Sequence, residues 1–90
     1  MQNRQDRLRA ALNAAFAPTL LEITDDSARH AGHAGAQPGG ETHYSIKIVS
    51  AAFAGQSRVA RSRAVHETLA NEFRDGLHAL SLTLRSPAEP

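Results

Sequence analysis

The side chains best suited to chemistry in this sequence are its five histidines, three of which lie in or beside one glycine-rich segment. They are His30, His33, His43, His66 and His78. Imidazole is the commonest neutral metal ligand in proteins, and the Gly/Ala segment that carries His30 and His33 could bring either ring to an ion. The same H-x-x-H spacing also occurs in solvated loops, so spacing alone leaves both interpretations open.

His78 differs from the others because it stands just after Gly76, at the entrance of the last predicted strand. A side chain there can project from the end of a sheet toward a neighbouring loop. It can equally serve as a boundary residue that bonds a backbone carbonyl, and its position does not decide between the two roles. His66 falls on the charged side of a predicted helix, where we expect it at the surface.

A group of arginines offers a second kind of chemistry. Arg58, Arg61 and Arg63 have no acidic residue among them, and Arg58 and Arg61 are one helical turn apart, so they could hold phosphate. A solvated helix face would look the same. On a chain of net charge +1, three arginines predict only weak nonspecific binding of nucleic acid, and no G-x-x-G clamp precedes this helix.

Enzymatic chemistry has little support in the composition. The 90 residues allow a single domain, 1–90, that is too small for an obvious substrate cleft, and no serine or aspartate stands at a recognised nucleophile spacing from a histidine. There is no cysteine, so a metal must use histidine, carboxylate or a partner's ligands. With a polar N-terminus and no run of about 20 apolar residues, we expect a cytoplasmic protein without a membrane partner.

The periodicity of apolar residues predicts the elements that would position these side chains. Leu8, Leu12 and Phe16 form the stripe of a helix that Pro18 ends. Alternation predicts strands over 20–24, 44–48 and 79–85, and a second helix runs from the Ser57 cap to Gly76, with Val59, Val65, Leu69 and Phe73 as its apolar stripe. A long glycine-rich loop occupies 26–42.

This order predicts an α/β (α+β) fold with the succession α-β-β-α-β. The first two strands form a hairpin, and a right-handed crossover makes the second and third strands parallel, which gives a three-stranded mixed sheet. Both helices then cover one face. The other face is polar and carries Glu22, Thr24, Ser45, Lys47, Ser81, Thr83 and Arg85.

Several segments in ordered succession resemble the BolA family. They are Glu22-Ile23-Thr24-Asp25-Asp26-Ser27, His30, Gly39-Gly40-Glu41-Thr42-His43-Tyr44, Ile48-Val49-Ser50, Phe53-Ala54-Gly55, Arg61-Ser62-Arg63-Ala64-Val65 and His78-Ala79-Leu80-Ser81. The resemblance covers a core of about residues 5–87. It implies a class II KH-like domain with the element order predicted above.

The resemblance also implies a partner and a cofactor. Members of the family pair with monothiol glutaredoxins around a shared [2Fe–2S] cluster, to which the glutaredoxin and its glutathione give sulfur ligands and the BolA-like protein gives histidines. His78 matches the ligand that precedes the last strand. His30 matches the loop ligand by its distance from Ser27, with His33 as the alternative. No cofactor is then expected in the isolated chain.

An alternative follows from the same resemblance, since some members are described as DNA-binding transcription regulators linked to stress response. Arg58, Arg61 and Arg63 would carry that contact. The family usually has Arg-His-Arg where this chain has Arg61-Ser62-Arg63, and this departure weakens the nucleic-acid interpretation. We therefore expect a non-enzymatic adaptor in iron–sulfur trafficking or iron regulation, with DNA as a weak partner at most.

Overall fold

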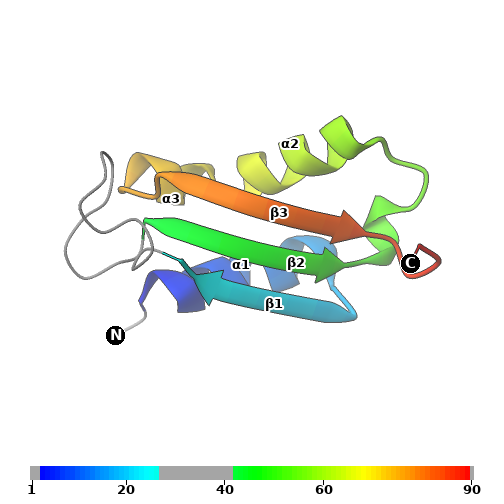
Figure 1. Ribbon diagram of the computed structural model, residues 1–90, viewed down its shortest axis with the longest axis horizontal. Coiled ribbons are helices and arrows are strands. Elements are labelled where there is room, and N and C mark those ends of the chain that lie inside the picture. Colours follow the sequence, from blue (N-terminus) through cyan, green and yellow to red (C-terminus); the bar gives the residue numbers. More distant parts are fainter. Residues whose placement is uncertain (1–2, 27–41, 90) are drawn as a thin grey trace.

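The computed structural model describes residues 3–26 and 42–89, and the histidines His30 and His33 lie outside them. Figure 1 shows one sheet with the helices on one side of it. The elements follow in the order α1 (Arg4–Phe16), β1 (Leu20–Asp25), β2 (His43–Val49), a 3₁₀ turn η2 (Ala51–Phe53), α2 (Arg58–Thr68), α3 (Ala70–Arg74) and β3 (Ala79–Arg85).

Helix α1 is capped at both ends, and it ends before Pro18 as predicted. The Asn3 side chain caps it by accepting a hydrogen bond from the Asp6 amide at 2.9 Å. Its apolar stripe is fully buried at Leu8 and Leu12. At the C-terminus Ala17 adopts a left-handed conformation with φ 44° and donates to the Asn13 carbonyl, just before Pro18. The helix is thus fixed at both ends and presents one face to the sheet.

The sheet has the predicted mixed topology, with strand order β1-β2-β3. Strands β1 and β2 are antiparallel and pair Ile23 with Ile46, whereas β2 and β3 are parallel and pair Ile46 with Leu82. A parallel pair needs a crossover, which α2 and α3 supply. This register brings the starts of β2 and β3 together, with His43 opposite Ala79.

The two faces of the sheet differ as the alternation predicts. On the helix-covered face one core joins all layers, and its buried members include Leu8, Leu12, Ile23, Tyr44, Ile46, Ile48, Phe53, Val65, Leu69, Leu77 and Leu84. The opposite face is a shallow polar surface lined by Glu22, Thr24, Ser45, Lys47, Ser81 and Thr83. The helices therefore cover a single face of the sheet, as predicted.

The second predicted helix is wrong in two respects. The helix is divided at Leu69 into α2 and α3, and Val59 is 59% exposed instead of buried. Six residues separate Val59 from Val65, a rotation of about 600°, so the two side chains diverge by about 120° around the axis. Arg61, four residues before Val65, lies on the buried face in its place, and it is only 8% exposed.

The short turn η2 between β2 and α2 contributes a core residue. Ser50 caps η2 by accepting from the Ala52 amide at 3.1 Å, and its hydroxyl donates to the Phe16 carbonyl at 2.6 Å. These bonds direct Phe53 inward, where it is fully buried with its ring centroid 5.1 Å from that of Phe16. Ser50 thereby joins the end of α1 to the end of β2.

An ion-pair cluster that the sequence analysis did not predict joins α1 to α3. Glu72 is bound by Arg4 at 3.2 Å and by Arg7 at 3.1 Å, and Arg4 also donates to the Asp75 carbonyl at 2.8 Å. Arg4 is only 7% exposed. Hydrogen bonds from Arg7 and then Arg4 lower the pKa of Glu72 below its ordinary value, against the opposing effect of burial.

Glu72→Gln should lower the free energy of unfolding at pH 7 by about 1–3 kcal/mol, because it leaves the buried Arg4 guanidinium beside a neutral amide. The folded chain has the lower pKa, so the carboxylate stabilises above the ordinary value of 4.5 and its contribution is lost as pH falls through the folded value. Urea unfolding at several pH values should show the variant and wild type converging below about pH 4.5. Glu67→Gln, at an exposed position of α2, is the matched control; a pH-independent difference would contradict this account.

Candidate metal centre

His78 stands at the end of the sheet where the two parallel strands start. Its backbone amide donates to the Thr42 carbonyl at 2.8 Å, and the Ala79 amide donates to the same carbonyl at 3.1 Å. Leu77, immediately before it, is buried and anchors the segment. The His78 side chain itself is exposed. A fixed backbone with an accessible imidazole can offer a nitrogen to a metal that approaches from solvent.

Both ends of segment 27–41 attach close to His78. Thr42, which follows the segment, is the residue that accepts from the His78 amide, and the Asp26 amide donates to the His43 carbonyl at 2.7 Å. The predicted ligands His30 and His33 belong to this segment and lie outside the described residues.

His43 is a neighbour of His78 that the sequence analysis did not select as a site residue. The two ring centroids lie 5.1 Å apart with an angle of 47° between the ring planes. His43 is 9% exposed, and its Nδ1 lies 2.9 Å from the Thr42 hydroxyl oxygen. The signal that could have found it is the parallel register, which sets the first residue of β2 beside the start of β3.

These groups do not amount to a complete metal site by themselves. In residues 3–26 and 42–89 no group of three or more His, Cys, Asp or Glu side chains is arranged to hold an ion. A cavity of about 210 Å³ opens beside His43 and is lined by Asp26, His43, Tyr44, Ala79, Leu80 and Ser81. An exposed imidazole fits the nitrogen half of a mixed nitrogen and sulfur ligand set, in which a second chain supplies the thiolates.

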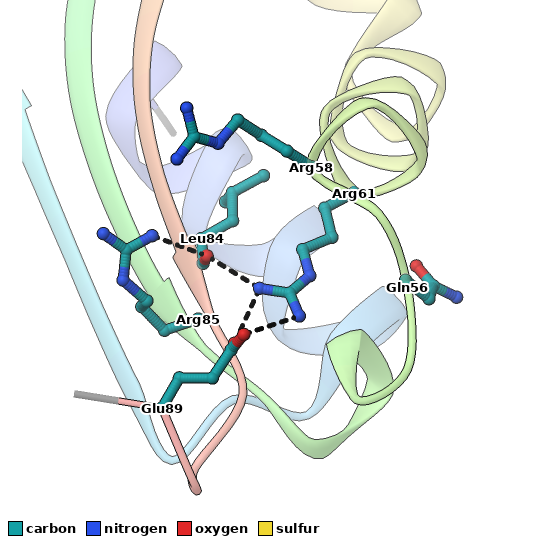
Figure 2. A pocket seen from close by; sticks show the side chains of 6 residues that line it. All are labelled: Gln56, Arg58, Arg61, Leu84, Arg85 and Glu89. Atoms are coloured by element: carbon teal, nitrogen blue, oxygen red, sulfur yellow. Dashed lines mark hydrogen bonds and ion pairs between the residues drawn. The ribbon is translucent and has the colours of Figure 1, made fainter.

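The predicted arginine group is divided by the fold. Arg58 and Arg63 are exposed, whereas Arg61 is buried and makes a two-pronged ion pair with Glu89, at 2.7 and 3.1 Å (Figure 2). Arg61 also donates to the Leu84 carbonyl at 3.1 Å and lies 5.9 Å from the centre of the Phe53 ring. Arg61 thus holds α2 to the end of β3 and is not available to a phosphate in this arrangement.

Glu89 completes a small C-terminal turn. Its carboxylate accepts from Arg61 and from the Ser86 amide at 2.7 Å, and its own amide donates to the Ser86 carbonyl at 3.1 Å. The Arg61 hydrogen bond is the main reason that the pKa of Glu89 falls to about 2. The partner of Arg61 lies 28 residues away in sequence, so charge patterning within the helix could not reveal it.

The remaining histidine lies apart from the candidate centre. His66 is exposed on α2, as predicted, and its Nδ1 lies 2.8 Å from the Ser62 carbonyl oxygen. Its ring stacks on Phe73, with 5.4 Å between centroids. Local contacts thus account for its orientation.

Within the described residues, no helix has the length and apolar character needed to cross a membrane.

Two similar proteins of Arabidopsis thaliana have names that include an organelle. SufE-like protein 1, chloroplastic/mitochondrial, is 44% identical over 97% of this chain. Protein BOLA1, chloroplastic, is 43% identical over 99% of it. The chain spans 24% of the first protein and 57% of the second. A cytoplasmic location stays a prediction.

Solved structures agree with these relatives. The BolA domain of SufE1 from Arabidopsis thaliana superposes with a TM-score of 0.90 at 42% identity and covers 100% of this chain and 99% of that one. BolA1 from the same organism gives a TM-score of 0.88 at 39% identity, with the same coverage. A family profile described as BolA-like protein matches residues 12–89. Sequence and fold together establish that this chain belongs to the BolA-like protein family.

Proposed function

We propose that this domain is a non-enzymatic adaptor that binds a monothiol glutaredoxin and contributes His78 to a bridging [2Fe–2S] cluster. The observation that carries the proposal is the exposed His78 imidazole on a fixed backbone, at the sheet end where segment 27–41 is attached. Membership of the BolA-like family supports it. In this role the domain serves iron–sulfur trafficking or iron regulation.

The chemistry of the available donors supports a shared cluster better than a self-contained one. The chain has no cysteine, so every sulfur ligand must come from the glutaredoxin and its glutathione. Imidazole in place of thiolate on one iron makes a [2Fe–2S] cluster less negative and raises its potential. His78 and one histidine of segment 27–41 would supply the two nitrogens.

Co-expression with a monothiol glutaredoxin, followed by anaerobic purification, tests this function. We expect a complex of the two chains with visible absorption that differs from that of the glutaredoxin alone. The isolated domain, treated in the same way, should be colourless. Two chains that elute separately, with all colour in the glutaredoxin fraction, would contradict the proposal.

The choice between the two histidines of the segment gives a further prediction. We expect His30→Ala to weaken the cluster of the mixed complex more than His33→Ala, because His30 is four residues from the anchored Asp26 and His33 is seven. Loss of visible absorption over time in a chelator challenge would measure this. The reverse order would identify His33 as the ligand.

A further inference from the structure

Strand β3 has one edge that no strand covers within the described residues, since the sheet order is β1-β2-β3. The Arg85 carbonyl accepts from the Ser50 amide at 2.9 Å, on the side of β2. Successive residues of a strand direct their backbone groups to opposite sides, so those of Leu80, Leu82 and Leu84 point to the open edge. Such an edge can pair with a further strand.

One point of this edge is already occupied. The Leu84 carbonyl accepts from Arg61 at 3.1 Å and from Arg85 at 3.2 Å, as the dashed lines in Figure 2 show. Among the described residues, the side-chain bonds to this edge are those at Leu84, and none reaches the backbone of Leu80 or Leu82. The stretch that can still pair is therefore short and ends before Leu84.

A groove lies between this edge and α2. It has a volume of about 460 Å³; Leu80, Leu82 and Leu84 form its apolar part, and Arg58, His66 and Arg85 are among its polar lining. Of the residues in 3–26 and 42–89, no Asp or Glu lines it. Figure 2 shows Arg58 extending from the start of α2 toward β3, on the side where Arg85 lies. The groove thus combines a pairing edge, apolar side chains and positive charge.

Among the described residues, the positive charge of Arg58 and Arg85 has no carboxylate paired with it. Glu89 makes its ion pair with Arg61. Glu89 shows how a carboxylate is held at this strand end, by two parallel bonds from one guanidinium. Arg58 and Arg85 can hold further carboxylates in the same way.

We propose that this groove binds an extended acidic segment of a partner protein, which adds to β3 as a fourth strand. The backbone of the segment pairs with Leu80 and Leu82, its apolar side chains pack beside the leucines, and its carboxylates bind Arg58 and Arg85. A nucleic-acid strand would use the arginines but neither the pairing edge nor the leucines. The charged part of this surface is distinct from the candidate metal centre, because Arg85 lies at the opposite end of β3 from His78 and Arg58 lines the groove with it.

A fluorescein-labelled hexapeptide of alternating valine and glutamate is a direct probe, read by anisotropy and by amide chemical shifts in NMR. We expect saturable binding, with shifts at Leu80 and Leu82. Arg58→Ala should weaken binding about fivefold to tenfold through loss of a charge-assisted contact. Arg63→Ala, on the same helix but outside the groove, should leave it unchanged. The glutamine version of the peptide should bind more weakly.

Backbone pairing has its own test. Two versions of the peptide carry N-methyl groups on alternate amides, so each blocks one edge of the peptide strand. One version should lose at least about tenfold in affinity and the other should retain it, because only one edge can face β3. Equal binding by both versions would overturn the proposal. Equal binding of a lysine-containing peptide, or no saturation at millimolar peptide, would also overturn it. A short DNA duplex that displaces the peptide and shifts the same amides would do so as well.

Discussion

His78→Ala should abolish the visible spectrum of the mixed complex with a monothiol glutaredoxin, or convert it to that of the glutaredoxin alone. The reason is that His78 is the exposed imidazole beside which segment 27–41 attaches, and alanine offers no nitrogen in its place. The measurement is an absorption and circular dichroism spectrum of the anaerobically purified complex.

The fold should survive this substitution. The His78 side chain is exposed, and the backbone at His78 and Ala79 is held by amide hydrogen bonds to the Thr42 carbonyl, which alanine keeps. The free energy of unfolding should therefore change by no more than about 0.5 kcal/mol. His66→Ala removes an exposed histidine of α2 and is the matched control. An unchanged mixed spectrum in His78→Ala would eliminate His78 as a ligand, whatever the result for the loop histidines.

His43 offers a second comparison at the same site. It is buried, and its ring packs against that of His78, so it can orient that ring without touching a metal. A substitution that disturbs the ring contact should change the shape of the spectrum, whereas loss of His78 removes the nitrogen itself. The two outcomes separate a positioning role from a ligand role.

Local patterning was enough to predict the sheet and its polarity. Alternation in 20–24, 44–48 and 79–85 predicted three strands, and the structure extends the first to Asp25 and the second to His43–Val49. The polar face followed from the same alternation, because a side chain's parity along a strand sets its face. The handed crossover then specified the parallel pairing that brings His43 toward His78.

Contacts between residues far apart in the chain were not predictable in this way. The sequence alone assigned Arg61 to a candidate phosphate contact, but its charge is met by Glu89 and its bond to the Leu84 carbonyl, both contributed by the C-terminal end of the chain. Glu72 likewise pairs with Arg4 and Arg7, more than 60 residues earlier. Periodicity reports which face of an element is buried, and not which side chain of another element it meets.

Phe53→Ala should destabilise the domain by about 3–5 kcal/mol, the second large effect that we expect. Phe53 is fully buried, contacts Phe16 at 5.1 Å between centroids and lies under the Arg61 guanidinium. Truncation leaves a cavity where the end of α1, η2 and α2 meet. Against a total stability of about 5–15 kcal/mol for a domain of ordinary size, such a loss removes a large share of the free energy of unfolding, and nearly all of it at the lower end of that range.

Val59→Ala is the control that makes this prediction specific. Periodicity predicted Val59 in the buried stripe, whereas in the structure Val59 is 59% exposed and Phe53 is fully buried. Urea unfolding should therefore show a change within about 0.5 kcal/mol for Val59→Ala. If Val59→Ala proved the more damaging substitution, α2 would be rotated about its axis, and Arg61 could not reach both Leu84 and Glu89. A large effect of Phe53→Ala together with a small effect of Val59→Ala would support the helix orientation that keeps Arg58 on the β3 side of α2.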